Sequence, residues 1–306
     1  MKGLILVTGS EGLVGSRFID ISKRKNFLHY PTKVEFDITN SEDVANLINS
    51  YNFSAVINFA AFTDVNLAEE ERGDKDKSCW QVNVEGVKNL ASAIKAHVER
   101  VHFIHISTNM VFSGAEGDPG PYTEDRLPEE NSSKLTWYGY TKGQAENVIR
   151  NILGDRASIV RISYPVRASY DGKLDYLRRA LQLFDEGKLY PLLTDQQISV
   201  TYIDELCELL DKIIIGNTRG NFHACSSNSI SPYKLIGEVI KKTRNERADL
   251  QPIVLEEILS RKKLPSFRYP RFGTLSVEKT EKTLDFRFST WEEIVEKLIA
   301  QGLGKI

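Results

Sequence analysis

Short apolar runs that alternate with helix-length segments are the feature that most constrains how this chain can fold. The apolar runs span residues 3–7, 54–61, 101–108 and 157–163, and segments with helical patterns lie at 12–25, 41–50, 77–98 and 139–153. Strands of this length between helices are typical of a doubly wound parallel sheet, because right-handed crossovers place helices on both faces. Burial on both faces also explains why the runs are apolar nearly throughout. We therefore predict an α/β fold of the Rossmann type.

The regular alternation loosens after residue 163. Short strands near 189–194 and 220–225 mix with helical patterns, which span 174–186, 203–215, 231–243 and 290–301. We therefore expect a Rossmann-type domain at 1–163, to which a segment at about 195–220 returns. A smaller, interleaved lobe is expected mainly from 164–194 and 221–306. The segment 113–133, rich in Gly, Pro and acidic residues, is predicted to be a long loop, and such loops tend to lie at functional sites.

Charge and composition exclude several function classes. The chain has 40 Lys and Arg against 42 Asp and Glu, a formal net charge of −2, so we expect no nucleic-acid partner. No apolar run approaches the roughly 18 residues that a transmembrane helix needs, so we expect no membrane association. The three cysteines, Cys79, Cys207 and Cys225, are too far apart in the sequence to indicate a disulfide framework or a metal-ligand cluster. We expect a cytoplasmic protein without a bound metal.

Three glycines follow the first apolar run at intervals of three residues: Gly9, Gly12 and Gly15. Glycines in such a turn let the backbone approach a pyrophosphate and let the next helix pack closely on the strand. The amides of Leu13 and Val14, at the start of that helix, would then face the phosphates. The alternative is a tight turn that needs glycine only for packing. Because the loop directly follows the first strand, we favour dinucleotide binding.

The choice between NAD(H) and NADP(H) depends on the residues after the second strand. A site for NAD(H) usually has an acidic residue there, about 20 residues past the glycine loop, which binds the ribose hydroxyls. Residues 28–34 contain no carboxylate, and the first one is Glu35. Lys33, or Arg17 in the first helix, could face a 2′-phosphate instead, although Lys33 could equally be a surface lysine. We therefore favour NADP(H) over NAD(H).

Tyr138 and Lys142 stand four residues apart at the start of a predicted helix, so both lie on one face. A phenol with its ordinary pKa of about 10 exchanges protons poorly at neutral pH. A nearby ammonium favours the phenolate, so we expect Lys142 to lower the pKa of Tyr138. Thr108 ends the preceding strand, at the sheet edge where open α/β sheets bind ligands. We predict that these three residues form a catalytic group.

A series of segments matches one protein family in order and spacing. The segments include INFAAFTDVNLAEEE (57–71), VNVEGVKNLA (82–91), ISTNMVF (106–112), YGYTK (138–142), RISYPV (161–166) and RFGTLSVEKTEKTLDF (271–286). On these residues the chain resembles the extended short-chain dehydrogenase/reductases, specifically those of the dTDP-4-dehydrorhamnose reductase kind. The resemblance covers most of the chain. It implies a dinucleotide-binding Rossmann domain, a smaller substrate-binding lobe and a nucleotide-sugar substrate, and it allows a homodimer.

The resemblance also implies a role for each residue that matches a family motif. Tyr138 would give a proton to the C4 carbonyl oxygen of a 4-keto sugar while the nicotinamide delivers hydride to C4. Lys142 would bind the nicotinamide ribose, Thr108 would hydrogen-bond the same carbonyl oxygen, and Asn83 would support a proton relay. The other matching positions would contact adenine (Asp37, Ile38), the cofactor ribose and phosphates (Ala60, Ala61, Phe62) and the substrate (Asn109, Tyr164, Arg271). Asn83 could instead bond only to backbone, and Tyr164 could be an ordinary core residue.

Departures from the family pattern distinguish related reactions. A 4,6-dehydratase of the superfamily would carry Asp and Glu after Thr108 for acid-base elimination, and this chain has Asn109 and Met110. No cysteine stands near this strand end for the carbon-acid chemistry of an epimerase-reductase. Simple carbonyl reduction is the reaction that remains.

Further departures lie where a sugar nucleotide would contact the protein, at Asn66, Leu67, Ile198, Val200 and 129–137. They leave open a second hypothesis, a catalytically inactive NADP-binding regulatory subunit resembling that of methionine adenosyltransferase. The joint retention of Thr108, Tyr138 and Lys142 favours the enzyme.

Overall fold

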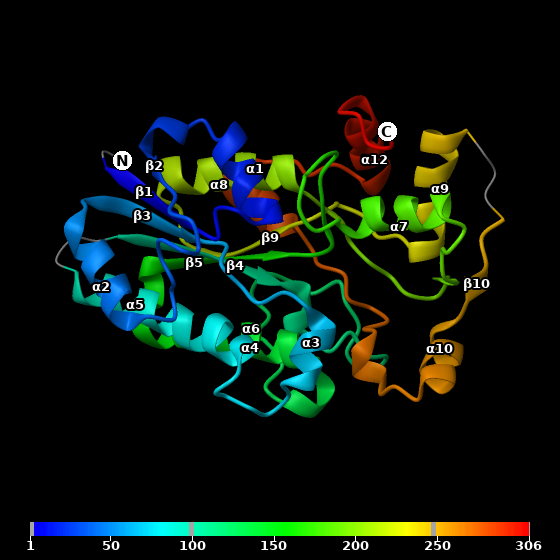
Figure 1. Cartoon of the computed structure of the whole chain (residues 1–306), viewed down its shortest axis with the longest axis horizontal. Helices are drawn as coiled ribbons and strands as arrows, with labels where there is room; N and C mark the ends of the chain where they lie inside the picture. Colours follow the sequence, from blue (N-terminus) through cyan, green and yellow to red (C-terminus); the bar gives the residue numbers. More distant parts are fainter. Residues whose placement is uncertain (1–2, 98–100, 246–248, 306) are drawn as a thin grey trace.

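A six-stranded parallel sheet forms the centre of the protein (Figure 1). The computed structural model describes residues 3–97, 101–245 and 249–305. The strands stand in the order β2-β1-β3-β4-β5-β9, and each neighbouring pair is parallel. Their bounds are β1 (Leu4–Thr8), β2 (Leu28–His29), β3 (Phe53–Asn58), β4 (His102–Thr108), β5 (Ala157–Ile162) and β9 (Gly220–Ala224). The predicted doubly wound α/β fold is confirmed.

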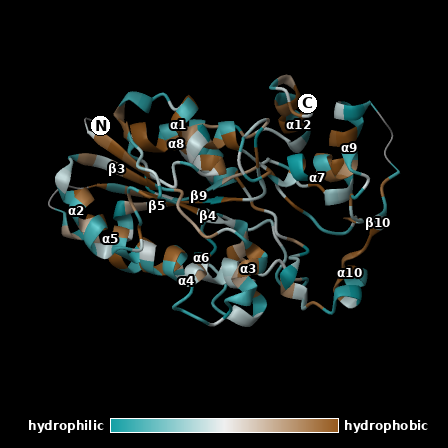
Figure 2. Cartoon of the chain, viewed as in Figure 1, coloured by the Kyte–Doolittle hydropathy of each residue, from teal (hydrophilic) through white to brown (hydrophobic). Residues whose placement is uncertain are grey.

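Helices cover both faces of this sheet. On one face lie α1 (Leu13–Ile21) and α8 (Ile203–Gly216), and on the other α2 (Ser41–Ser50), α5 (Gly86–Ala96) and α6 (Trp137–Leu153) (Figure 1). Strand β1 shows why the apolar runs suit this arrangement, because Ile5 and Val7 join one core cluster and Leu6 joins the other. All three side chains are fully buried, and Figure 2 shows β1 and β3 as hydrophobic segments between helices of mixed polarity.

The segment predicted as one helix at 77–98 is divided into three parts. α4 (Ser78–Trp80) leads into a π-helical turn (Gln81–Glu85), and α5 follows; Val98 lies outside the described residues. The π turn contains Asn83, whose side chain bonds to the backbone of Phe62 in the loop after β3. Such turns are frequent at functional sites. That loop continues into α3 (Val65–Glu70).

The smaller lobe packs its helices around a core of its own. Its helices are α7 (Tyr176–Asp185), α9 (Pro232–Arg244), α10 (Leu255–Lys262) and α12 (Trp291–Ala300), and its short strand pairs are β7 (Leu192–Leu193) with β10 (Pro252–Ile253) and β6 (Pro165–Val166) with β8 (Thr201–Tyr202). Single 3₁₀ turns occur at Lys25–Phe27, Asn109–Val111, Ser132–Lys134, Gly154–Arg156 and Ser266–Arg268. The core of the lobe draws on α7, α9 and α12.

The boundary between the two parts differs from the predicted one. β9 is an edge strand of the central sheet, and α11 (Glu278–Leu284) packs against it. Phe222 of β9 and Leu284 of α11 are buried in the same cluster as β1 and α8. The chain therefore returns to the Rossmann core at 203–224 and again near 275–288, because apolar side chains there complete one face of the sheet.

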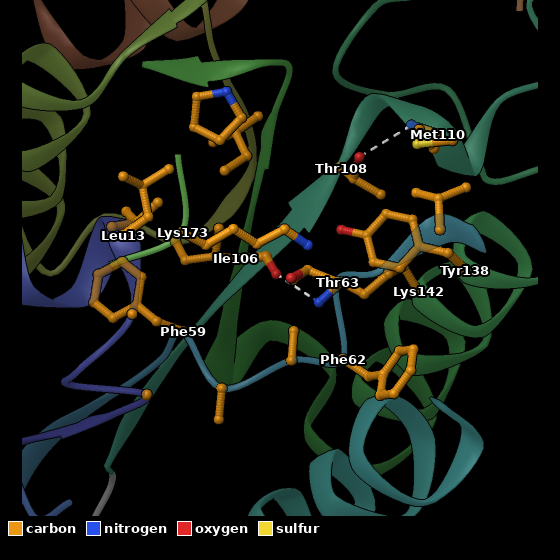
Figure 3. A pocket seen from close by; sticks show the side chains of 18 of the residues that line it. Leu13, Phe59, Phe62, Thr63, Ile106, Thr108, Met110, Tyr138, Lys142 and Lys173 are labelled. Carbon is orange, nitrogen blue, oxygen red and sulfur yellow. Dashed lines mark hydrogen bonds between the residues drawn. The ribbon is translucent and has the colours of Figure 1, made fainter. Parts of the chain in front are cut away.

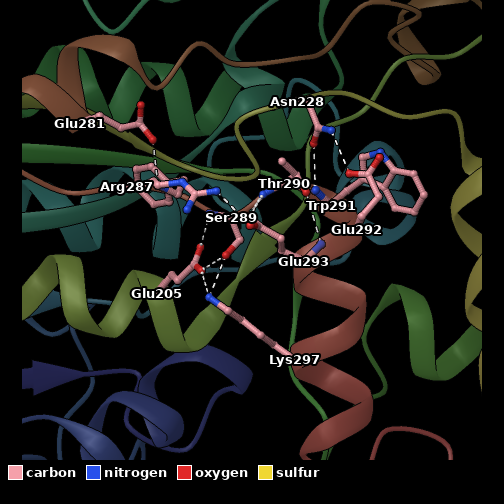
Figure 4. A network of polar contacts seen from close by, with 11 residues as sticks. Glu205, Asn228, Glu281, Arg287, Ser289, Thr290, Trp291, Glu292, Glu293 and Lys297 are labelled. Carbon is pink, nitrogen blue, oxygen red and sulfur yellow. Dashed lines mark hydrogen bonds and ion pairs between the residues drawn. The ribbon is translucent and has the colours of Figure 1, made fainter.

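A polar network joins the last helix of the lobe to the Rossmann core (Figure 4). Glu205 of α8 accepts hydrogen bonds from Ser289 Oγ at 2.5 Å and from Lys297 Nζ at 2.8 Å. Thr290 and Glu293 form a capping box at the start of α12, which satisfies the first amides of that helix. These contacts hold the lobe against the sheet domain and thereby define the space between them.

The predicted loop at 113–133 packs against the 270–276 segment instead of entering the cavity described below. Tyr122 N donates to Thr274 O at 3.0 Å, and Gly120 N donates to Phe272 O at 3.0 Å. The loop therefore supports a segment that itself reaches the cavity. Within the described ranges, no helix combines the length and the apolar character needed to cross a membrane, and no three His, Cys, Asp or Glu side chains group together to hold a metal ion.

Candidate active site

A cavity of about 1140 Å³ lies at the carboxyl ends of β1, β3 and β4, between the sheet and the smaller lobe. Most of the residues that the sequence singles out line it: Gly9, Gly12, Leu13, Val14, Gly15, Lys33, Asp37, Ile38, Ala60, Ala61, Phe62, Thr108, Asn109, Tyr138, Lys142 and Tyr164. Three predicted site residues, Arg17, Asn83 and Arg271, are not part of its lining. The cavity thus joins the glycine loop and the predicted catalytic group in one space.

The glycine loop has the geometry of a phosphate cradle. Gly9 has φ +68°, which favours glycine, and a Cβ there would lie 2.5 Å from Ala60 N. A Cβ on Gly15 would lie 2.3 Å from Gly9 O, so only glycine allows α1 to start this close to the turn. Gly12 is the N-cap of α1 and supplies no side-chain cap, which leaves the first amides of the helix available to an anion. These residues fit the pyrophosphate of a dinucleotide.

The two candidate cations for a 2′-phosphate differ in their position relative to the cavity. Lys33 lines it, and the Lys33 backbone amide donates to Glu11 Oε2 at 3.0 Å. The Arg17 guanidinium instead makes two hydrogen bonds of 2.7 Å to the carboxylate of Asp204 on α8. Arg17 therefore joins two helices on the outer side of the sheet, and it is not brought to the cavity. Asp37 lines the cavity while one of its oxygens accepts both the amide and the hydroxyl of Thr39.

Tyr138, Thr108 and Lys142 converge on one region of the cavity (Figure 3). Tyr138 stands in the first turn of α6, which begins after the N-cap Thr136, whose hydroxyl accepts from Gly139 N at 3.1 Å. Thr108 is the last residue of β4, and its side chain points to the same part of the cavity as the Tyr138 phenol, while its hydroxyl accepts from Met110 N at 3.2 Å. Lys142 lies one helical turn further along α6 and is almost fully buried.

Burial shifts the proton affinities of this group in a direction that the sequence did not indicate. It raises the pKa of Tyr138 to about 12, against the opposing effect of the hydrogen bond with Thr108. Burial also lowers the pKa of Lys142 to about 7, although Glu146 acts in the opposite sense. The expectation that Lys142 lowers the pKa of Tyr138 is therefore wrong for this structure, because burial raises this pKa and Lys142 is not among the groups that shift it. Tyr138 is a neutral phenol at neutral pH and can donate a proton.

The contacts of Lys142 include a residue that no motif predicted. Its Nζ donates to Ile106 O at 2.7 Å and lies 3.0 Å from His105 Nε2. His105 is fully buried in β4. The one signal in the sequence was the pair of histidines at 102 and 105, which interrupts an otherwise apolar strand.

Asn83 does not line the cavity but holds the backbone of a residue that does, Phe62. Its side chain bonds to Phe62 N at 2.9 Å, to Phe62 O at 3.1 Å and to Thr141 Oγ1 at 3.0 Å. Asn83 itself is fully buried and does not line the cavity. Asn83 therefore bonds to backbone, but not only to backbone, because it also donates to the Thr141 hydroxyl; its part in a proton relay stays a prediction.

Another part of the cavity is lined by residues from several loops. Tyr164 lines it with a left-handed φ of +42° and packs edge-on against Tyr176, with ring centroids 5.1 Å apart. Asn109 lines it and donates to Gly273 O at 2.8 Å. Arg271 forms ion pairs with Glu116 and Asp195 and stays outside the lining.

Two further cations of the lining, Lys173 and Arg268, were not predicted. Lys173 Nζ lies 3.2 Å from Asp64 Oδ2, and Arg268 Nη2 donates to Asn66 Oδ1 at 2.6 Å. Both side chains reach across the cavity from the smaller lobe to the start of α3. No local motif marks them, because each acquires its position only when the lobe folds against the sheet domain.

Comparison with known proteins gives the family. The model of the family described as the RmlD substrate binding domain matches residues 1–303. The chain belongs to this family. A dTDP-4-dehydrorhamnose reductase of Aggregatibacter actinomycetemcomitans is 26% identical over 97% of this chain and 98% of that protein. A probable low-salt glycan biosynthesis reductase of Haloferax volcanii is 27% identical over 96% of each.

Solved structures of similar proteins share the fold of this RmlD family member. A dTDP-4-dehydrorhamnose reductase of Bacillus anthracis in complex with NADP has a TM-score of 0.83 at 23% identity, covering 98% of this chain and 100% of that chain. A dTDP-glucose 4,6-dehydratase of the same organism in complex with NAD has a TM-score of 0.71 at 18% identity, covering 97% and 96%. The resemblance to the extended short-chain dehydrogenase/reductases is confirmed, and the chain is placed among the oxidoreductases of that superfamily.

Proposed function

We propose that this protein is an NADP(H)-dependent reductase of a nucleotide-linked 4-keto sugar, in which Tyr138 donates the proton to the C4 oxygen. The observation that carries the proposal is the position of Tyr138, Thr108 and Lys142 in the same cavity as the glycine loop. Relatives that match almost the whole chain are named as reductases of such a sugar nucleotide, which supports the substrate class.

The proton chemistry follows from the environment of Tyr138. A bound nicotinamide would supply hydride to the carbonyl carbon, so the oxygen gains charge and needs a proton. Tyr138, whose pKa burial raises to about 12, holds that proton at neutral pH. Thr108 would hydrogen-bond the same oxygen, because its side chain points to the same part of the cavity as the Tyr138 phenol. Lys142, which lies one turn further along α6 in the same lining, would bind the cofactor ribose.

The proposal of NADP(H) over NAD(H) rests on Lys33. This lysine lines the adenosine end, whereas Arg17 is engaged with Asp204. β2 ends at His29, and residues 30–34 after it supply no carboxylate for the ribose hydroxyls. The NADP in a structural neighbour of the same family agrees with this choice.

The cavity as a whole has the size for a cofactor together with a sugar nucleotide. A site for one small ligand occupies about 300–1,000 Å³, and this cavity of about 1140 Å³ has room for a second molecule beside the cofactor. Lys173 and Arg268 also line it, and a diphosphate would bind these cations in competition with their carboxylate partners, Asp64 and Glu69. Asn109 and Met110 replace the acidic residues of a dehydratase, so reduction is the reaction that the side chains support.

A screen of nucleotide-linked 4-keto sugars with dTDP, UDP and GDP tests this function. Turnover is followed as NADPH oxidation, with Tyr138→Phe as the matched control, because it removes only the phenolic hydroxyl. We expect one nucleotide series to be reduced, and Tyr138→Phe to lose at least about 100-fold in kcat while binding NADPH with nearly unchanged affinity. Normal turnover by Tyr138→Phe would show that the proton donor is assigned wrongly. Tight cofactor binding without turnover of any sugar would instead favour the inactive regulatory subunit.

A further inference from the structure

A line of buried polar side chains connects Lys142 with the first strand. His105 Nε2 lies 3.0 Å from Lys142 Nζ, and His105 Nδ1 lies 3.0 Å from the side-chain nitrogen of Asn58. Asn58 Oδ1 accepts from Thr8 Oγ1 at 2.5 Å. Thr8 directly precedes Gly9 and lines the cavity, whereas His105 and Asn58 are completely buried. The proposed mechanism uses Lys142 and gives no role to the three residues behind it.

The hydrogen-bond capacities of these groups allow two arrangements. An ammonium can only donate, so a charged Lys142 needs a lone pair on His105 Nε2. The imidazole proton then sits on Nδ1, and Asn58 must present its oxygen to it. The structure has the other amide orientation, with the Asn58 nitrogen toward Nδ1. This orientation corresponds to an Nδ1 that accepts, an Nε2 that carries the proton and a neutral Lys142 amine that accepts from it. The histidine tautomer, the amide orientation and the charge of Lys142 are therefore coupled.

Both charge states of Lys142 occur near neutral pH, because burial lowers its pKa to about 7. His105 does not take up the charge itself, since burial and the nearby Lys142 ammonium hold the His105 pKa well below its ordinary range. The ionisable groups whose charges act on the pKa of Lys142 are Glu146, on the same helix, and Cys79, on α4. Glu146 is paired with other side chains, including a buried contact of 2.7 Å to Arg161.

We propose that His105 is a positioning residue that keeps Lys142 hydrogen-bonded in both charge states, one imidazole tautomer accepting from the ammonium and the other donating to the amine. Asn58 turns its amide to match each tautomer, and Thr8 can donate to the amide oxygen or accept from the amide nitrogen. Ile106 O, at 2.7 Å, accepts from Lys142 in either state. Lys142 thereby holds one place beside Tyr138 while its charge changes. The proposal rests on the proposed function, because that function makes Lys142 part of the catalytic group.

The tautomer itself can be observed without any substrate. In protein labelled with ¹⁵N in the histidine rings, the two tautomers give distinct nitrogen shifts, and the His105 signals are those lost in His105→Gln. We expect the protonated nitrogen to change from Nδ1 to Nε2 as the pH rises through about 7. The change should disappear in Lys142→Met. A single His105 tautomer from about pH 6 to about pH 9, the same in both proteins, overturns the proposal.

Kinetics with a substrate from the screen supply a second test. Replacing His105 by Leu removes both the acceptor and the donor, so the pH midpoint of kcat should fall by about one unit as the ammonium loses a partner. His105→Gln offers an amide oxygen and an amide nitrogen and should restore most of that midpoint. The matched control is His102→Gln, on the same strand, where the buried imidazole contacts Ser158 and not Lys142. A wild-type pH profile in His105→Leu contradicts the positioning role.

The two readouts separate this inference from the proposed function. If no sugar nucleotide is reduced but the tautomer responds to Lys142, the coupling stands and the reaction is assigned wrongly. If turnover occurs and the tautomer never changes, the reaction stands and His105 has only a packing role.

Discussion

The side-chain amide of Asn83 makes two hydrogen bonds to the backbone of a single residue, Phe62, accepting from its N–H at 2.9 Å and donating to its C=O at 3.1 Å. Phe62 lies in the loop after β3 and lines the cavity, whereas Asn83 lies behind it in a π-helical turn. The side-chain amide thus pairs with both polar groups of one residue, as a neighbouring strand does in a β-sheet. It fixes the wall of the cavity against α6, because Asn83 also donates to Thr141.

Asn83→Leu should therefore act by removing the hydrogen bonds that hold the Phe62 backbone. Leaving both polar groups of Phe62 unpaired should lower the free energy of unfolding by about 2–3 kcal/mol and weaken cofactor binding. At saturating cofactor and substrate, kcat should stay within about threefold of the wild-type value. Denaturant unfolding, a cofactor titration and steady-state kinetics measure the three quantities. Thr141→Val, which spares both bonds to Phe62, should cost less, about 1 kcal/mol. A large loss of kcat with unchanged stability would instead give Asn83 a direct part in proton transfer.

Gly12→Val should block the pyrophosphate site without preventing folding. The backbone at Gly12 has φ −73° and ψ 167°, an extended conformation that valine readily adopts. Its Cβ would lie 3.3 Å from Gly9 O, and the side chain would occupy the start of α1 where the phosphates are expected. NADPH affinity, followed by fluorescence titration, should fall at least about tenfold, which corresponds to 1.4 kcal/mol of binding free energy. Gly117→Val, at a position with no atom within 4 Å of a new Cβ, is the control. Unchanged NADPH affinity in Gly12→Val would show that the phosphates bind at another position.

Substitution of Lys33 should change cofactor affinity, whereas substitution of Arg17 should change the stability of the fold. Lys33→Ala should weaken NADP⁺ binding about tenfold and leave NAD⁺ binding unaltered, because only NADP⁺ carries the 2′-phosphate. Arg17→Ala should leave both affinities unchanged and lower the free energy of unfolding by about 1 kcal/mol, since the pair with Asp204 is partly exposed to solvent. Calorimetric titration with each cofactor and thermal unfolding distinguish the two variants. The reverse pattern would mean that Arg17 turns from Asp204 to the cofactor.

The depressed pKa of Lys142 should make stability depend on pH. Burial lowers this pKa to about 7 from an ordinary value of 10.5. Between those two values the unfolded chain binds more protons than the folded one, so the contribution of Lys142 to the free energy of unfolding rises with pH. The difference between wild type and Lys142→Met should therefore shift in favour of wild type from about pH 7 to about pH 10, with a slope of at most about 1.4 kcal/mol per unit. Urea unfolding of both cofactor-free proteins across this range measures it. A difference that does not vary with pH would show that Lys142 keeps its ordinary pKa.

The fold and much of the site could be predicted because they depend on local patterns. Alternating apolar runs predict the parallel sheet, since a strand buried on both faces must be apolar along its length. The glycine spacing after β1 and the four-residue spacing of Tyr138 and Lys142 act within single turns of backbone, so they are visible in the sequence. The end of an apolar run indicated Thr108, and the family motifs added Asp37 and the 60–62 segment; all of these line the cavity.

Tertiary structure alone decided which long-range partner each polar side chain takes. Arg17 pairs with Asp204, 187 positions away, so its guanidinium lies between α1 and α8 and not where the cofactor ribose is expected. Lys173 and Arg268 reach the cavity from the smaller lobe, and the buried contact between Lys142 and His105 forms only when α6 packs on β4. The tertiary structure also decides the directions of the pKa shifts at Tyr138 and Lys142, because these shifts arise from the exclusion of water. Sequence spacing determines which groups share a turn of helix or an edge of sheet; the packing of distant segments determines what surrounds them, and hence their charge.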